Sequence, residues 1–271
     1  MAIDLAPLWD FSKPEVSEQR MRAALELAKG DDALILQTQI ARTYGLRKEF
    51  SKARDILKAI SKEVSAAGPE ARARYSLEIG RTYASAAHPP DLQTPESKTL
   101  ARESFESAVF IAKSDHLDDL TIDAIHMLAF VDTSPIDQVK WGQEALAVSM
   151  ASSKPEAKKW EASIRNNMGY ALHQLGRFDE ALVHFKQAVV LRERSKDAES
   201  TRVAYWMVAW TLRALGRMDE ALEIQLRLER ECDAAKAPDR YVYEELEILY
   251  RARGDETRAR QYANLVESTP G

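Results

Sequence analysis

The stretch from Leu175 to Leu182 recurs, with one change, about one repeat length further along the chain. It reads Leu-Gly-Arg-Phe-Asp-Glu-Ala-Leu, and the segment from Leu215 to Leu222 differs only in carrying methionine in place of phenylalanine. Self-similarity at a fixed spacing of this kind is typical of repeat architectures, in which each unit packs only against its neighbours. The motif therefore predicts one continuous array of repeats rather than a set of separate globular domains.

Apolar residues elsewhere recur at the three- and four-residue spacing of helices, and no stretch alternates as a strand does. We expect an all-α fold of about six helical hairpins over residues 31–271, ending in a capping helix. Residues 1–30 are expected to hold an amino-terminal segment, folded back on the first helices, and a helix from Pro14 to Gly30. The third hairpin is degenerate, and residues 88–95 are an insertion in the turn of the second.

Charge and cysteine content narrow the classes of partner and compartment. The net charge is -5 and the isoelectric point is near 5.7. The chain as a whole is therefore not attracted electrostatically to a phosphate backbone, and we expect no nucleic-acid partner. Cys232 is the only cysteine, which excludes an intramolecular disulfide. No stretch approaches the roughly 20 apolar residues of a membrane helix, and no leader-like pattern opens the chain. We expect a cytoplasmic protein without a membrane contact.

The repeat resembles the tetratricopeptide family. That pattern has an aromatic residue, Leu-Gly, a second aromatic, then Ala and a large residue, in one helix-turn-helix unit. The resemblance is strongest between Met168 and Ala188, where Gly169 and Ala181 are the small residues that let paired helices approach and Phe185 fills the space between them. It implies a right-handed α-solenoid and a concave groove, lined by the first helix of each hairpin, as the usual binding surface.

Helix geometry selects candidates for the groove, because residues displaced by one or two positions from the packing stripe face the neighbouring side. The selected side chains are rich in aromatic, amide, imidazole and guanidinium groups, and each helix contributes a set at three- and four-residue spacing. The candidate ligand-binding residues are Arg42, Arg81, Asp123, His126, Phe130, Asn166, Asn167, Tyr170, His173, Trp206, Trp210, Arg213, Glu244 and Arg251, with Thr38 and Tyr241 beside them.

Trp206 and Trp210 need an explanation because Tyr205 and Val208 already supply the packing stripe of their helix. One interpretation is that this long helix is buried on both sides. The other is a stacking wall for a ligand, with Arg213 one turn further to pair with a carboxylate or phosphate. On that second interpretation, replacing Arg213 with alanine would weaken binding without unfolding the protein.

Catalysis and metal binding have little support in the sequence. His126 and His173 are lone histidines on helices, which are more often structural than catalytic, and no closely spaced His or Cys pair suggests zinc. The nucleotide-binding loop, the nucleophile elbow and the zinc-protease motif are all missing. We therefore expect no cofactor, no metal and no catalytic residue, which favours a protein that is not an enzyme.

Four arginines, at positions 42, 81, 213 and 251, could form a locally positive groove in an acidic protein, or could simply be solvated charges. Within the family, clamps for a carboxyl terminus rely on Lys and Asn in the first repeats. Thr38, Arg42, Leu77 and Arg81 stand at those positions, so that particular role is not expected.

Two functions from different classes remain open. The first is a scaffold or adaptor that binds a peptide or an acidic protein segment in its groove. The alternative is a sensor or enzyme that closes around a small anionic or aromatic ligand, for which Asp123, His126, Asn166, Tyr170 and Trp210 would form a pocket. Self-association through Leu8, Trp9 and Phe11, as a homo-oligomer, is a third arrangement.

Overall fold

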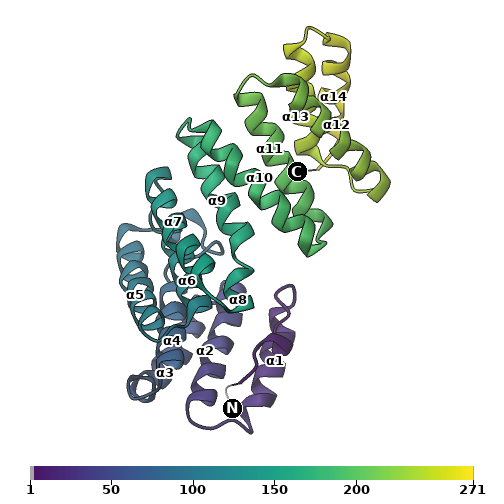
Figure 1. Cartoon of the computed structure of the whole chain (residues 1–271). Coiled ribbons are helices and arrows are strands. Elements are labelled where there is room, and N and C mark those ends of the chain that lie inside the picture. The colour runs from purple at the N-terminus through teal and green to yellow at the C-terminus, as the bar shows by residue number, and fades with distance from the viewer. Residues whose placement is uncertain (1–2, 271) are drawn as a thin grey trace. The chain divides into compact units, whose positions relative to one another are not determined.

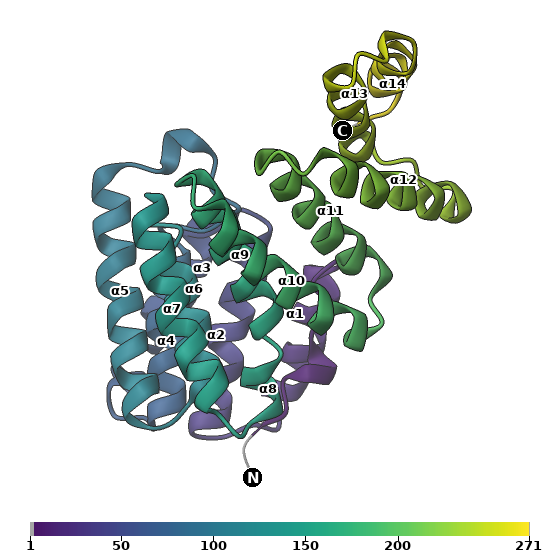
Figure 2. The same ribbon diagram turned by 45° about the horizontal axis from the view of Figure 1, so that its top comes forward.

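The computed structural model describes residues 3–270, and those residues form helices and connecting turns without strands. The all-α repeat fold is therefore confirmed. Contacts between helices divide the chain into two compact units, unit 1 at residues 1–158 and unit 2 at residues 159–271. Within each unit, consecutive helices lie side by side (Figure 1 and Figure 2).

Unit 1 holds the amino-terminal helix and three hairpins, whose first helices are α2, α4 and α6 and whose second helices are α3, α5 and α7. A single-turn helix, α8, follows and packs on α6 and α7. The elements are η1 (Ala6–Leu8), α1 (Pro14–Leu25), α2 (Asp31–Leu46), α3 (Phe50–Ser65), α4 (Pro69–Arg81), η2 (Pro90–Leu92), α5 (Pro95–Ser114), α6 (Asp118–Leu128), α7 (Pro135–Ala151) and α8 (Pro155–Lys158).

The amino-terminal segment packs against α1 and α2. Leu8 and Trp9 pack against a core formed by Met21, Leu36 and Ile40. Helix α1 is shorter than the sequence suggested. It ends at Leu25 rather than at Gly30, whose positive φ of 56° turns the chain into α2.

The insertion at residues 88–95 is anchored both to helix α3 of the preceding hairpin and to its own hairpin. The ring of His88 is buried and stacks on Phe50 with a centroid distance of 3.8 Å, while its Nε2 lies 3.1 Å from the carbonyl oxygen of Thr82. Thr94 then caps α5 by accepting a hydrogen bond from the amide of Ser97. Buried stacking and a helix cap fix both ends of this loop.

Unit 2 consists of three further hairpins, with first helices α9, α11 and α13 and second helices α10, α12 and α14. The first of these hairpins begins at Glu161 and not directly after Pro155, because the helical conformation is interrupted between α8 and α9. The elements are α9 (Glu161–Gln174), α10 (Phe178–Ser195), α11 (Ala198–Ala214), α12 (Met218–Ala235), α13 (Arg240–Ala252) and α14 (Glu256–Ser268).

The repeated motif forms the turn between the helices of a hairpin. Gly176, Gly216 and Gly254 have φ values of 72°, 75° and 76°, in the left-handed region that glycine enters without a steric cost. The residue after the glycine closes the turn: the amide of Arg177 donates a hydrogen bond to the carbonyl oxygen of Leu172 at 2.9 Å. The acidic residues that follow lie in the first turn of the second helix, where the helix dipole favours them.

Size complementarity sets the packing of the two helices in a hairpin. Phe185 of α10 is fully buried, and a Cβ atom added at Gly169 of α9 would lie 2.7 Å from its ring. Gly80 and Phe105 repeat the arrangement in unit 1, where the added Cβ would lie 2.3 Å from the ring. The predicted roles of Gly169 and Phe185 are therefore confirmed.

Candidate functional site

Four side chains in unit 1 form a charged cluster, which comprises Arg42, Glu78, Arg81 and Asp123. Arg81 lies between the two carboxylates, with its guanidinium nitrogens 2.6 Å from Glu78 Oε1 and 2.5 Å from Asp123 Oδ1. Arg42 is more distant, at 3.9 Å from Glu78 and 4.0 Å from Asp123. The residues come from α2, α4 and α6, so the cluster joins the three first helices of unit 1.

Burial and mutual charge set the protonation states in the charged cluster. Burial opposes the charge of Arg81, but Asp123 and Glu78 outweigh it and its pKa rises above the ordinary value. Burial also opposes the charge of Asp123, yet Arg81 and Arg42 hold its pKa below 3.8. For Arg42, burial and the charge of Arg81 lower the pKa, against the attraction of the two carboxylates. With two cations and two anions, the charged cluster is neutral overall.

Neighbouring groups complete this face of unit 1. The guanidinium carbon of Arg42 lies 5.4 Å from the ring centroids of both Trp9 and Phe11, which stack on each other. His126 meets Phe130 edge-on at 5.5 Å, and burial lowers its pKa although Asp123 acts in the opposite direction. Thr38 is fully buried, with its hydroxyl donating to the carbonyl oxygen of Ile35.

A second cluster in unit 2, the aromatic row, links its three first helices. Trp210 stacks on His173 at a centroid distance of 3.4 Å and on Trp206 at 5.8 Å. Tyr170 lies 5.9 Å from Trp210. Trp206 meets the ring of Tyr241 at 6.4 Å and donates from Nε1 to its carbonyl oxygen at 3.1 Å. The rings stabilise one another, but Tyr170 and Tyr241 keep 42% and 59% of their surface exposed.

His173 is the perturbed titratable group of the aromatic row. Its ring lies between Trp210 and Phe178, and its Nε2 is buried without a hydrogen-bond partner in residues 3–270. Burial, with the charge of Arg213 second, lowers the pKa of His173 from 6.5 to about 4. The imidazole is therefore neutral at pH 7 and offers an aromatic face.

We expect an NMR titration of the His173 ring to give a pKa of about 4, with the resonance identified by its loss in His173→Gln. Because the folded pKa is below the unfolded one, the unfolded chain binds more protons between pH 6.5 and pH 4. The free energy of unfolding therefore falls as the pH is lowered through that window. A midpoint near 6.5 would contradict the buried position of the ring.

The predicted arginines of unit 2 have acidic partners. Arg213 makes two hydrogen bonds of 2.7 Å to the carboxylate of Glu245, whose side chain is 5% exposed. Arg251 pairs with Glu247 at 2.7 Å, and Glu244 pairs with Arg240 at 2.9 Å. Together with the charged cluster, these pairs contradict a locally positive groove made of four arginines, because each of them lies beside a carboxylate.

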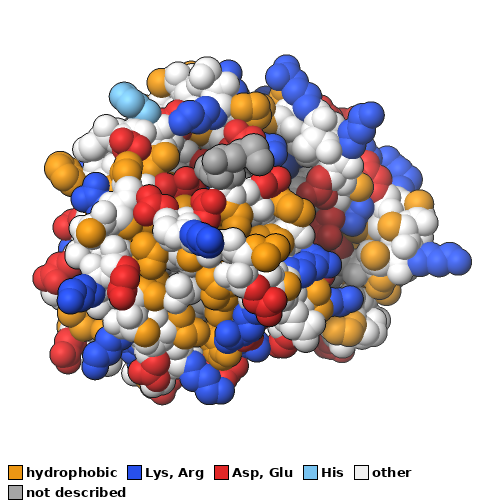
Figure 3. All heavy atoms as spheres, turned by 90° about the horizontal axis from the view of Figure 1, so that it is seen from below, with side chains coloured by type: hydrophobic (Ala, Val, Ile, Leu, Met, Phe, Trp, Pro, Cys, Tyr) orange, Lys and Arg blue, Asp and Glu red, His pale blue; other side chains and the backbone are white. Residues whose placement is uncertain are grey.

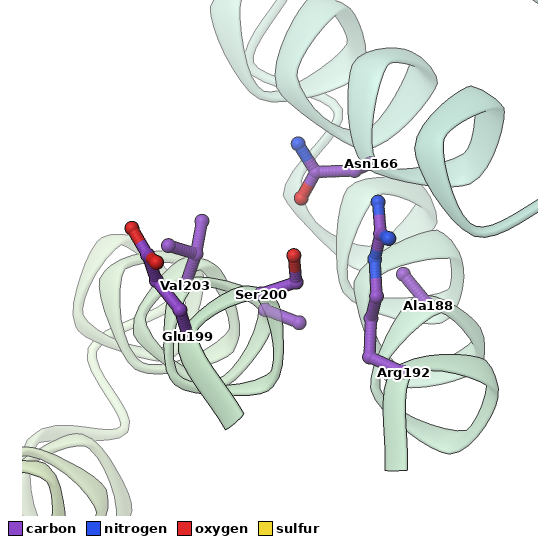
Figure 4. A pocket seen from close by; sticks show the side chains of 7 residues that line it. Asn166, Ala188, Arg192, Glu199, Ser200 and Val203 are labelled. Carbon is purple, nitrogen blue, oxygen red and sulfur yellow. The ribbon is translucent and has the colours of Figure 1, made fainter. Parts of the chain in front are cut away.

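Two cavities border the amino-terminal half of α11 within unit 2. The polar cavity has a volume of about 160 Å³ and is lined by Asn166, Ala188, Arg192, Glu199, Ser200 and Val203. In Figure 4, Asn166 and Arg192 face Ser200 and Val203 across this cavity. The apolar cavity has a volume of about 270 Å³ and is lined by Val203, Trp206, Met207, Leu228, Tyr241 and Val242.

The sequence pattern predicts part of this arrangement. Asn166 lies in the polar cavity, whereas Asn167, its neighbour, is exposed. Glu78 and Glu245 were not selected, although each is an acid within an apolar stretch of a first helix, which is the pattern that a buried partner for arginine leaves. No sequence pattern marks Arg192 and Ser200, because they come together only when the turn between α10 and α11 places the end of one helix beside the start of the next.

Surface charge, possible metal ligands and membrane-spanning potential are properties of the described residues, 3–270, that bear on function. On the face that Figure 3 shows, acidic and basic side chains are interspersed with apolar ones. Among residues 3–270, no three His, Cys, Asp or Glu side chains are grouped to hold a metal ion. In the same residues, every helix is too short or too polar to cross a membrane.

Comparisons with known proteins agree with this architecture. Residues 160–230 match the sequence profile described as tetratricopeptide repeat. No curated protein matches the chain. The fold is similar to a signal transduction ATPase with numerous domains from Pyrococcus horikoshii that has a tetratricopeptide repeat sensor, with a TM-score of 0.74 and 13% identity. That match covers 94% of this chain but only 38% of the other protein.

Two further solved structures share the fold. The apo form of RapI has a TM-score of 0.67 and 14% identity, covering 95% of this chain and 71% of that one. Aspartyl phosphate phosphatase F from Bacillus subtilis has a TM-score of 0.59 and 17% identity, covering 97% and 69%. Residues 160–230 therefore match the tetratricopeptide repeat, and the chain has a fold similar to that of tetratricopeptide-repeat proteins.

Proposed function

We propose that unit 2 is a protein-interaction module whose aromatic row binds a segment of a partner protein. The observation that carries the proposal is the row itself, in which rings from three successive first helices meet and two tyrosines remain exposed. Aromatic side chains bury a large area on binding at a small cost in side-chain entropy. Trp and Tyr are accordingly enriched among the residues that dominate interface energies.

The charge pattern favours a largely uncharged segment over a strongly acidic one. Arg213 is already held by Glu245, and Arg251 by Glu247, so neither offers an unpaired cation to a partner. His173 is neutral at pH 7 and adds a ring face instead of a charge. Stacking and apolar burial would therefore supply most of the affinity.

Similar structures support a binding role of this kind. One of them is a Rap protein solved in complex with competence and sporulation factor, with a TM-score of 0.55 and 17% identity. Another contains a tetratricopeptide repeat described as a sensor. Both proteins use the same fold, and recognition by this chain is our proposal.

We expect Trp210→Ala to weaken binding of peptides selected on the full-length chain by at least about tenfold, because truncating a central interface aromatic costs roughly 2 kcal/mol. The peptides come from a random display library, and the dissociation constants are measured by fluorescence anisotropy. Phe110→Ala is the matched control, since Phe110 is an aromatic residue of α5 with 73% of its surface exposed.

Circular dichroism should show that Trp210→Ala keeps its helical content, and Tyr241→Ala provides a second variant at an exposed position. Equal affinity of the selected peptides for wild type, Trp210→Ala and Tyr241→Ala would refute the proposal. A library that yields no peptide dependent on these rings would refute it as well.

A further inference from the structure

The polar cavity and the apolar cavity occupy equivalent places in consecutive repeats. Each is lined by a first helix, the second helix of that hairpin and the next first helix. Their lining residues correspond at the spacing of the repeated motif, which is 40 from Leu175 to Leu215 and 38 from Gly216 to Gly254. The corresponding pairs are Asn166 with Trp206, Ala188 with Leu228, Val203 with Tyr241 and Ala204 with Val242.

One of these equivalent positions differs in chemistry between the two cavities. Where one has the amide of Asn166, the other has the indole of Trp206. Val203 lies between the two cavities and lines both. A ligand that lies across the successive first helices would therefore meet a polar pocket and an apolar pocket in turn.

The polar cavity offers both hydrogen-bond donors and acceptors. Arg192 donates one hydrogen bond to Ser163 at 2.8 Å and retains further donors. The side chains of Asn166 and Glu199 make no hydrogen bond within residues 3–270. A cation would be repelled by Arg192 and an anion by Glu199, whereas a carboxamide can accept from the first and donate to the second.

The apolar cavity has the walls of a socket for a large aliphatic or aromatic side chain. Trp206, Met207 and Val242 line it together with Leu228, which is fully buried. Arg202 and Asp239 stand at its edge with opposite charges. Filling such a socket removes apolar surface from water on both partners.

The separation of the cavities sets a spacing in the ligand. Packed helices lie about 8–10 Å apart, and the first helices of successive hairpins contact each other in unit 2. An extended chain of the polyproline type rises about 3.1 Å per residue and presents the same side every third residue. Side chains three positions apart therefore lie about 9 Å apart on one side.

We propose that the two cavities together recognise an extended segment of a partner protein that carries Gln or Asn three residues away from a large apolar residue. The amide enters the polar cavity and the apolar side chain enters the apolar cavity. This specificity rests on the proposed function of unit 2, and it names the chemistry that the module selects.

The test uses the full-length chain and labelled synthetic peptide pools in which Gln and Leu are fixed three positions apart, in both orders, among Ala, Ser and Thr. Anisotropy should show at least about tenfold tighter binding than for pools with the pair two apart, with Ala for Leu, or with Glu or Lys for Gln. Equal binding of all pools, or binding of none, would overturn the inference.

Variants of the lining residues should change which peptide is preferred, a result that loss of folding would not produce. Glu199→Lys should change the preference at the polar position from Gln to Glu, and Met207→Trp should abolish the preference for Leu over Ala. The matched controls are Glu223→Lys on α12 and Val183→Trp on α10, both at exposed positions. The inference fails if preferences stay unchanged in Glu199→Lys and Met207→Trp.

The two proposals fail in different ways. If display-selected peptides depend on Trp210 but show no preference for the spaced pair, the aromatic row binds partners and the two-cavity specificity is wrong. If no selected peptide depends on Trp210 or Tyr241, the proposed function itself is wrong.

Discussion

Arg81→Met is expected to destabilise unit 1 by about 3–5 kcal/mol, because removing one partner of a buried ion pair leaves the other charge without compensation. Arg81 has 12% of its side chain exposed, and its loss leaves Glu78 and Asp123, at 2% and 11%, facing each other beside Arg42 alone. Amide hydrogen exchange of α4 and α6 measures this change locally, which matters in a chain of two units.

The matched control is Arg177→Met. Arg177 forms a pair of similar geometry with Glu180, but 45% and 57% of the two side chains are exposed, so its removal should cost no more than about 0.5 kcal/mol. Adding Asp123→Asn to Arg81→Met should recover part of the loss. Equal effects of the Arg81 and Arg177 variants would contradict the structural role of the charged cluster.

The effect of Arg81→Met should also depend on pH. Arg81 and Arg42 hold the pKa of Asp123 below 3.8 against its burial, so the folded state favours the carboxylate. This contribution to stability is present above the unfolded pKa and is lost as the pH falls through the folded pKa. The difference between Arg81→Met and wild type should therefore narrow in acid.

Gly169→Ala is expected to destabilise unit 2 by about 1–3 kcal/mol, although alanine is the better helix former. The new Cβ would lie 2.7 Å, 2.8 Å and 2.9 Å from three atoms of the Phe185 ring, which is fully buried. Thermal unfolding followed by circular dichroism would show the loss as a lower midpoint temperature.

The chain itself supplies the compensating change. Where Ala41 stands in the first hairpin, the residue 16 positions later is Leu57, the same offset that separates Gly169 from Phe185, and the two pack in one core cluster. In the fifth hairpin, Ala209 is likewise followed by Gln225. Gly169→Ala/Phe185→Leu should therefore be more stable than Gly169→Ala, and a double variant that is less stable would contradict this explanation.

Residue pattern predicted the hairpins because the signals for a helical repeat are local. The glycine of each turn, the acids of the following first turn and the small residue opposite Phe185 all act within one hairpin. The end of α1 was missed because Gly30 starts the next helix without ending the previous one. The division into two units was not visible, since the break near Lys158 has no glycine or proline run.

Charge pairing was the part of the site that the sequence did not reveal. Arg81 and Arg213 find their partners 42 and 32 residues away, on the first helix of the next hairpin. In the sequence, an arginine on a helix face looks the same whether its guanidinium is free or paired with a carboxylate on another helix. The aromatic row was foreseen residue by residue, but the contact between its rings was not.

The sequence by itself determined the helical repeat and the residues that its first helices present, because periodicity and turn glycines act over a few positions. Only the tertiary structure decided which of those residues are neutralised, which stack and which line a cavity. Those properties depend on distances between side chains of successive repeats, which helix packing sets. A change of about an ångström in such a distance is enough to form or break a hydrogen bond or to open a buried contact.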